Sequence, residues 1–220
     1  KWVAGARGKP AINADIIAGG ALQAIADPQF EILGAGPPAT VNTDYSAEGG
    51  VLLTSTGGAN DQVIILPHLD ADQSAWNMVT WGTDRRVRWE CMIQTTAGIA
   101  ATTIWCGLKL TDTSVTATDL DQAFFRYQNG VATGNWQAVS SNNGVAEEFD
   151  TGVAVQVTTT YHLALAINNN RTVEFSVNGA LVHTTAALRD AIDLIPYIGV
   201  EGNAQTLLVF GQTISRNFGA

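Results

Sequence analysis

Hydrophobic and polar residues alternate in the middle of the chain, between Tyr161 and Thr185. Apolar side chains recur at every second position from Tyr161 to Ile167 and again from Val173 to Val177, and a period of two residues is typical of β-strands. Three asparagines, residues 168–170, provide a turn after the first strand. Asn178-Gly179 follows the second strand and favours a type I′ hairpin turn, because that turn needs positive φ at both central residues. The pattern predicts three consecutive antiparallel strands.

Shorter apolar runs predict the other strands of an all-β domain. They lie at residues 51–54, 63–66, 87–96, 101–110, 123–127, 135–139, 196–200 and 205–214. Turn residues such as Gly57-Gly58 and Pro67 separate the first of them. Apolar side chains fall on both faces of the 205–214 run, as expected for a strand in the middle of a two-layer sandwich. Residues 188–194 are predicted to form one helical turn.

The apolar positions of residues 87–110 predict a hairpin and its register. If Thr96 pairs with Ala101, the further pairs are Ile93 with Ile104, Cys91 with Cys106, Trp89 with Leu108 and Val87 with Leu110. All four pairs are apolar, and a slip of one residue would turn them toward water. Cys91 and Cys106 would then lie side by side, where a disulfide is geometrically allowed. Two reduced, buried thiols are the favoured interpretation, because two cysteines in a chain of this length form no disulfide framework.

Residues 1–45 differ from the rest, because they are rich in Ala, Gly and Ile and have no sustained period. We expect an extended N-terminal arm here, followed by a sandwich domain at residues 46–220. A short helix at residues 15–26 would contain Gly19-Gly20, which weakens it. An apolar arm without a period cannot bury itself, so it either wraps its own sandwich or lies on a neighbouring subunit.

Charge excludes two classes of partner. The formal net charge is −9 and the pI is about 4.6, whereas proteins that bind nucleic acids present cations to the phosphates. An anionic membrane surface is disfavoured for the same reason. No apolar run approaches the length of a membrane span, and the first residues, KWVAGARGKP, lack the apolar segment of a secretory signal. We therefore expect no nucleic-acid partner and no membrane partner.

The central meander resembles that of concanavalin A-like (laminin-G-like) jelly rolls. In that family a strand of the type Y-x-L-x-I is followed by a strand ending in N-G or D-G and then by L-V, as in Tyr161–Val182 of this chain. The resemblance implies a two-sheet antiparallel jelly-roll sandwich. It identifies a fold and does not by itself name a function.

Tryptophans and two aspartates are the candidate ligand contacts. Trp76 and Trp81 lie in a turn-rich connection, and Trp136 lies on a predicted strand. Such side chains usually cover the edge of a core, and the alternative is that they stack on a sugar ring. Asp119 and Asp121 form a D-x-D sequence in a polar loop that also holds Asp112. A solvated loop is the default interpretation, and calcium bound by carboxylate oxygens is the alternative.

Catalytic residues are not evident in the sequence. Glycoside hydrolases need two carboxylates beside the scissile bond, and one jelly-roll family of them carries E-x-D-x-x-E on a single strand. Residues 147–150 have acids at a different spacing, and Glu90 is isolated. His68, His162 and His183 lie on different predicted elements, outside any metal or triad motif, and the last two are expected to face solvent. We expect no enzymatic activity.

A second resemblance concerns five further motifs. They are W-x-T-D-x-x-V-R-W-E (81–90), I-W-C-G-L-K-L-T (104–111), F-F-R-Y (124–127), L-I-P-Y-I-G-V (194–200) and I-S-R-N (214–217). Together they resemble virion structural proteins of tailed bacteriophages, in which a jelly-roll domain decorates or cements the capsid or forms part of a fibre. The resemblance implies a non-enzymatic, homo-oligomeric virion protein, assembled in the host cytoplasm, that binds the major capsid protein through its arm and sandwich edges. The alternative is a carbohydrate-binding, lectin-like module on a tail or fibre, with Trp76, Trp81, Trp136, Asp119 and Asp121 as its glycan contacts.

Overall fold

The predicted meander is present in the structure, a computed structural model. The structure describes residues 2–3, 31–35, 42–45, 49–55, 62–66, 81–109 and 119–217. The meander strands are β11 (Thr160–Ile167), β12 (Val173–Val177) and β13 (Ala180–Thr184), and they are neighbours in that order. Asn178 and Gly179 have φ angles of 51° and 83°. Because positive φ at both residues defines a type I′ turn, the predicted turn is confirmed.

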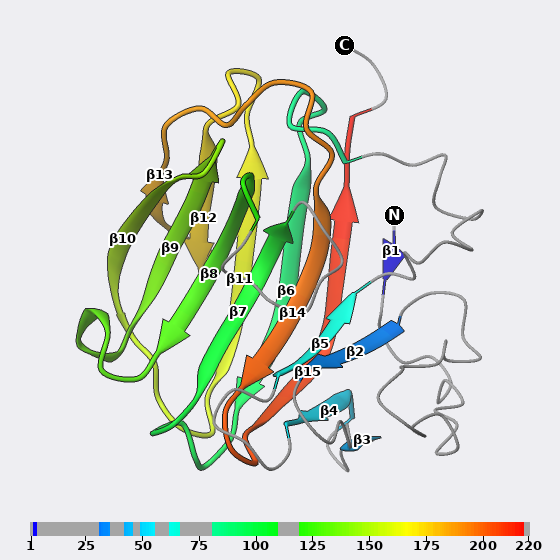
Figure 1. Cartoon of the computed structure of the whole chain (residues 1–220), viewed down its shortest axis with the longest axis vertical. Coiled ribbons are helices and arrows are strands. Elements are labelled where there is room, and N and C mark those ends of the chain that lie inside the picture. The colour runs from blue at the N-terminus through cyan, green and yellow to red at the C-terminus, as the bar shows by residue number, and fades with distance from the viewer. Residues whose placement is uncertain are drawn as a thin grey trace.

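Two antiparallel sheets make up the described part of the chain, and in Figure 1 the seven-stranded sheet lies in front of the eight-stranded sheet. The eight-stranded sheet has the order β13, β12, β11, β6 (Arg88–Thr95), β15 (Thr206–Ser215), β4 (Val51–Thr54) and β3 (Asn42–Tyr45), with β1 (Trp2–Val3) also paired to β15. The seven-stranded sheet has the order β10 (Val145–Ala154), β9 (Asn135–Asn142), β8 (Gln122–Gln128), β7 (Thr103–Lys109), β14 (Ile195–Glu201), β5 (Gln62–Leu66) and β2 (Glu31–Ala35). A 3-10 turn, η3 (Ala132–Gly134), precedes β9. The prediction of an all-β, two-sheet antiparallel sandwich is confirmed.

Strands β6 and β7 do not form the predicted hairpin. In the eight-stranded sheet Cys91 of β6 pairs with Leu163, and in the other sheet Cys106 of β7 pairs with Ile198. The predicted pairing of these cysteines on adjacent strands is therefore wrong, and Leu110 lies outside the described residues. Alternation specifies which side chains face the core, but it does not specify whether the next strand lies beside the first or across the sandwich from it.

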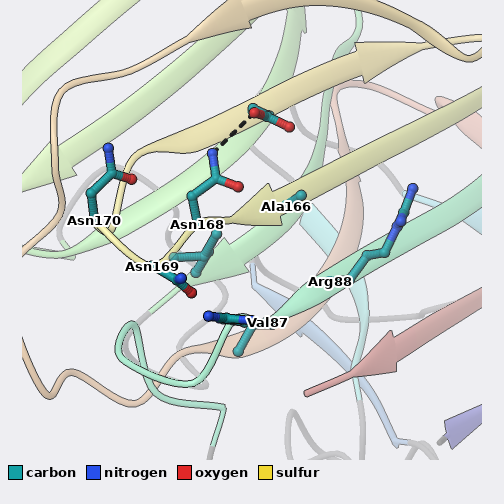
Figure 2. A pocket seen from close by; sticks show the side chains of 9 residues that line it. Val87, Arg88, Ala166, Asn168, Asn169 and Asn170 are labelled. Atoms are coloured by element: carbon teal, nitrogen blue, oxygen red, sulfur yellow. Dashed lines mark hydrogen bonds between the residues drawn. The ribbon is translucent and has the colours of Figure 1, made fainter. Parts of the chain in front are cut away.

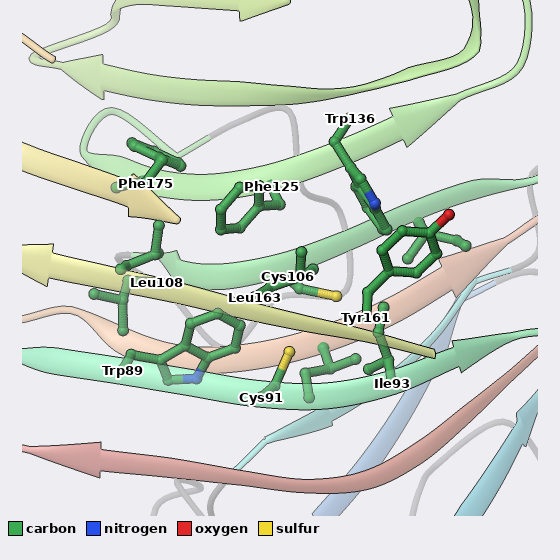
Figure 3. Packing of buried hydrophobic residues seen from close by; sticks show 14 of the residues in the cluster. Trp89, Cys91, Ile93, Cys106, Leu108, Phe125, Trp136, Tyr161, Leu163 and Phe175 are labelled. Atoms are coloured by element: carbon green, nitrogen blue, oxygen red, sulfur yellow. The ribbon is translucent and has the colours of Figure 1, made fainter. Parts of the chain in front are cut away.

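The core fills the space between the sheets (Figure 3). Trp136 meets Tyr161 edge to face at a ring-centroid distance of 5.5 Å, and Phe125 meets Phe175 in the same way at 5.1 Å. Edge-to-face contact is a favoured geometry because the positive ring edge meets the negative ring face. The aromatic side chains thus join β8 and β9 of one sheet to β11 and β12 of the other.

Cys91 and Cys106 lie in this core as free thiols, in line with the favoured interpretation. They project from opposite sheets and are close enough for a hydrogen bond between them. Burial raises the pKa of the Cys106 thiol well above its usual range, and the contact with Cys91 adds to the effect. A protonated thiol in a closed core has little reactivity.

Three short strands come from the predicted N-terminal arm. β1 pairs with β15, β2 with β5 and β3 with β4, so these parts of residues 1–45 extend the two sheets of their own chain. The predicted helix at 15–26 lies outside the described residues. A domain boundary at residue 45, and contact of the arm with a neighbouring subunit, stay predictions.

The segment before β14 contains no helical turn, contrary to the prediction for residues 188–194. Asp190 and Ala191 form a turn, with Ala191 at a φ of 53°, and Asp193 makes an isolated β-bridge with Gly82. The bridge requires an extended backbone at Asp193, and a helical turn there would not allow it. Within the described ranges, no helix has the length and apolar character needed to cross a membrane.

Candidate functional site

The tryptophans predicted to contact a glycan are part of the core. Trp136 has 0% and Trp81 4% of its surface exposed, and both belong to the main apolar cluster between the sheets. Because both side chains project into the space between the two sheets, which a sugar does not enter, the structure contradicts the glycan contacts assigned to these two residues. Their other interpretation, packing against the core, agrees with the structure. Trp76 lies outside the described residues.

The two predicted acidic contacts, Asp119 and Asp121, are also buried, at 6% and 2% exposure. The Asp121 carboxylate is 2.6 Å from Nη2 of Arg189 and accepts a hydrogen bond of 3.2 Å from the backbone N–H of Asn143. Its cationic partner is thus a guanidinium group. The described residues contain no group of three or more His, Cys, Asp or Glu side chains arranged to hold a metal ion, and Asp112 lies outside them.

His183 does not face solvent as predicted. Its Nε2 lies 3.0 Å from Oε1 of Glu147, its ring stacks on Phe149 at 4.1 Å, and only 14% of its side chain is exposed. These contacts join the edge strands β10 and β13 of the two sheets. His162 keeps 41% of its side chain exposed and lies 3.4 Å from Glu90.

The residues that the structure gathers into a candidate site lie on the outer face of the seven-stranded sheet, the side away from the core. Its side chains alternate along each strand with the core residues. Those that form the site are Trp105 and Lys109 of β7, Gln122, Phe124 and Arg126 of β8, Gln137 and Val139 of β9, Glu148 of β10, Tyr197 of β14, and Gln62 and Ile64 of β5.

Aromatic rings occupy the centre of this outer face. Trp105, Phe124 and Tyr197 form a second apolar cluster with Ile64 and Val139, and the three rings are 1%, 4% and 0% exposed. The rings of Phe124 and Tyr197 are 6.2 Å apart between centroids. Lys109 Nζ lies 5.2 Å from the centroid of Tyr197, within the range of a cation–π contact.

Two glycines let these rings lie against the sheet. A Cβ at Gly199 would lie 2.6 Å from Nε1 and 2.9 Å from Cε2 of Trp105, so the indole covers this position. Gly107 lies between Phe124 and Tyr197 in the pairing register. The absence of side chains at these two positions makes room for the ring platform, which consists of Trp105, Phe124 and Tyr197.

Polar atoms beside the rings lack hydrogen-bond partners. They are Nε1 of Trp105, the hydroxyl of Tyr197, and Oε1 of both Gln122 and Gln62; all are buried, and none has a partner among the described residues. Leaving such a group unpaired costs about 1–3 kcal/mol, so native proteins retain few of them without a bound water or ligand. Burial, and to a lesser degree Cys106 and Asp119, raise the pKa of Tyr197 well above its usual value, and Arg126 opposes them. The hydroxyl is therefore protonated at neutral pH and can donate a hydrogen bond.

A partly exposed polar row borders the platform. Arg126 donates from Nε to Oε1 of Gln137 at 2.9 Å and from Nη2 to Oε2 of Glu148 at 2.6 Å. Arg126 and Glu148 keep 21% and 46% of their side chains exposed, and Trp105 is the cross-strand neighbour of Arg126. Rings next to fixed donors and acceptors are the elements of a site for a ligand with both apolar faces and hydroxyl groups.

Sequence reasoning missed this outer face because it followed only the core-facing positions of each strand. The alternate positions also carried a signal: Trp105, Phe124 and Tyr197 are aromatic where a solvent-facing strand residue would be polar. Apolar character on both faces of β7, β8 and β14 indicates a second packed or binding surface.

The comparisons with known proteins concern the fold. No family model and no curated protein matches the chain. Among solved structures, it is similar to a protein of unknown function from Shewanella oneidensis, with 14% identity, coverage of 84% of this chain and 77% of that one, and a TM-score of 0.56. It is similar to a β-glucanase from Bacillus licheniformis, with 11% identity, coverage of 86% and 93%, and a TM-score of 0.56. It is also similar to the carbohydrate binding module CBM66 from Bacillus subtilis, with 14% identity, coverage of 80% and 92%, and a TM-score of 0.50. The chain has the concanavalin A-like sandwich fold, as the first resemblance implied.

Proposed function

We propose that this protein binds carbohydrate through the outer face of the seven-stranded sheet. The observation that carries the proposal is the set of unpaired polar atoms on Trp105, Gln122 and Tyr197, next to aromatic rings. Sugar rings combine an apolar face with hydroxyl groups. Trp105 and Tyr197 offer unpaired donors and Gln122 an unpaired acceptor, on side chains that are buried, so a ligand has to open this face to reach them. The partly exposed Arg126 and Glu148 form the entrance, and the buried rings form the floor.

The fold supports this proposal without naming a ligand. A carbohydrate binding module and a β-glucanase share the sandwich with this chain, so the same architecture carries saccharide sites in other proteins. Identities of 11–14% transfer no substrate.

The test compares a tyrosine of the outer face, Tyr197, with a tyrosine of the core, Tyr161. Tyr197→Phe removes a hydroxyl without a hydrogen-bond partner among the described residues, so the free protein should keep or gain stability. Its affinity for a neutral oligosaccharide, found by array screening and measured by calorimetry, should fall about tenfold for one lost hydrogen bond.

Tyr161→Phe is the matched control. The Tyr161 hydroxyl accepts from the N–H of Gln156 at 2.7 Å and donates to the carbonyl of Ala154 at 3.2 Å in the core. Its loss should lower stability and leave affinity unchanged. If the array shows no ligand, or if both variants bind as the natural protein does, the proposal is wrong.

We further propose that binding occurs without cleavage of the saccharide. Two carboxylates on this part of the sheet already have partners within the protein. Glu148 forms an ion pair with Arg126, and Asp150 accepts hydrogen bonds from the side-chain amide of Asn135 and from the N–H of Gly152. Recovery of the bound oligosaccharide at its original length, by mass spectrometry after long incubation, is the expected result. Shortened products would contradict it.

The virion function is a second proposal. It rests on the five sequence motifs and on exposed apolar side chains at the sheet edges, where Val145 of β10 is 75% and Leu181 of β13 is 60% exposed. Exposed apolar strand edges favour contact with another chain, here the major capsid protein or a second copy of this protein. None of the three similar structures is described as a virion protein.

The measurement that tests the virion proposal is the copy number of the chain in purified virus particles, by quantitative mass spectrometry. A number near that of the shell protein supports a decoration role, and absence from particles contradicts it.

A further inference from the structure

A groove opens on the opposite side of the sandwich, at one end of the eight-stranded sheet (Figure 2). Its volume is about 590 Å³, and it is lined by residues 86–88, which lead into β6, by residues 166–170 at the end of β11, and by Glu174 of β12. Ligand pockets are typically about 300–1,000 Å³ in volume. The groove is therefore large enough for one or two sugar units.

Hydrogen bonds hold one wall of the groove in place. Asn168 donates from Nδ2 to Oε1 of Glu174 at 3.0 Å and to Oγ1 of Thr172 at 3.2 Å. Asn170 accepts from the hydroxyl of Thr172 at 2.9 Å. Between them, the side-chain amide of Asn169 is exposed and has no hydrogen bond with a described residue. It is available to a ligand on a loop that its two neighbours make rigid.

The other wall carries positive charge. Arg86 and Arg88 are exposed, and neither guanidinium has an ion pair or hydrogen bond with a described residue. Arg126, Arg171 and Arg189, by contrast, each have an acidic partner.

The surroundings of the two arginines leave them open to a ligand. The cross-strand neighbours of Arg88 are Ala166 and Ser215, which are too small to cover it. Arg86 has a φ of 51°, a conformation that costs energy for a residue with a Cβ. The nearest acid on β6, Glu90, lies beside His162. Two cations without an acidic partner among the described residues thus face a groove in a protein with a net charge of −9, and the acidic lining residue Glu174 lies beside Asn168 on the other wall.

We propose that this groove binds an acidic saccharide, by a carboxylate or sulfate group. The planar guanidinium fork matches two oxygens of either group, and such charge-assisted pairs are stronger than neutral hydrogen bonds. The amide of Asn169 can donate to and accept from sugar hydroxyls. The site is independent of the outer face of the seven-stranded sheet and shares with it only the broad class of ligand.

The experiment measures binding of four probes by calorimetry at low and high salt. The probes are a galacturonate oligomer, a sulfated dextran oligomer, a neutral maltooligosaccharide of the same length, and inorganic sulfate. We expect at least one acidic oligomer to bind, with an affinity that falls as salt rises. Arg88→Gln and Arg86→Asn should each weaken this binding about tenfold, and asparagine tolerates the positive φ at position 86.

Arg85→Gln is the matched control, because Arg85 is an exposed neighbour whose Nε already pairs with Asp84 at 3.2 Å; it should leave affinity unchanged. Thermal melting verifies that each variant is folded. Unchanged affinity in the Arg86→Asn/Arg88→Gln double variant, equal binding of the neutral oligomer, or equal binding of inorganic sulfate would each overturn the proposal. Tyr197→Phe should not affect this site, so failure here and failure of the outer-face proposal are distinguishable.

Discussion

At the scale of single residues, the environment decides what a side chain can do. Trp105 of β7 and Trp136 of β9 are the same residue type in the same sheet, yet Trp136 packs between the sheets and Trp105 lies on the outer face over Gly199. Both are buried, and both ring nitrogens lack a partner among the described residues. Trp105 differs in lying on the outer face beside Arg126 and in the same cluster as Tyr197, where we propose that a ligand binds.

Asp193 provides a prediction on pH at this scale. Burial and the neighbouring Asp84 raise its pKa, and Arg216 and Arg85 oppose them. A carboxyl with a raised pKa holds its proton more tightly in the folded state than in the unfolded state. Its favourable contribution to the free energy of unfolding is therefore present below the pKa of the unfolded state and is lost as the pH rises through the pKa of the folded state. Asp193→Asn should therefore stabilise the protein near pH 7 by roughly 0.5 kcal/mol, since solvent screens this exposed group.

The gain should shrink as the pH falls into the range in which Asp193 binds its proton. Urea denaturation of the natural and variant proteins at pH 7 and pH 4 measures it, because the other carboxylates contribute equally to both. Asp190→Asn is the control: Asp190 pairs with Arg171 at 3.6 Å, and its loss should give no gain. A variant that is less stable at pH 7 than the natural protein would refute the prediction.

At the scale of secondary-structure elements, alternation and turn chemistry predicted the strands well. The meander formed as expected because its hydrophobic period and its Asn178-Gly179 turn favour the same local structure. The β6 and β7 strands also formed, but the predicted pairing between them was wrong. The same side chains are buried whether the two strands lie side by side in one sheet or face each other across the core, so the hydrophobic pattern does not distinguish the two arrangements. The helical turn at 188–194 was wrong because a bridge to Gly82, far away in sequence, determines the backbone there.

Gly199→Ala tests the close packing of β14, β7 and β5. The new Cβ would lie 2.5 Å from Cγ2 of Ile64 and 2.6 Å from Nε1 of Trp105, so the indole must move. We expect a loss of about 1–3 kcal/mol in the free energy of unfolding, together with weaker saccharide binding at the outer face. Gly98→Ala is the control, since its Cβ would meet nothing within 4 Å, and it should change stability by less than about 0.5 kcal/mol. Equal stability of the two variants would contradict the proposed packing.

At the scale of the whole molecule, the sandwich closes over the free thiols of Cys91 and Cys106. Labelling with a thiol reagent at pH 8 should be slower than for a free thiol by at least about a thousandfold, because access requires opening of the core. The raised pKa of Cys106 slows it further. In denaturant, both thiols should react at once. Rapid labelling of the native protein, or a mass 2 Da lower without reductant, would contradict free thiols in a closed core.

The sequence by itself determined the all-β class, the extent of most strands, the type I′ turn and the set of core-facing residues, because each of these follows from local propensity and a short period. The tertiary structure alone decided which strands pair and which residues gather at a site. Arg126 and Trp105 lie on strands separated by a long connection, and Arg88 and Asn169, far apart in the sequence, line the same groove. The pairing of strands within each sheet brings these residues together, and no local sequence pattern predicts that pairing.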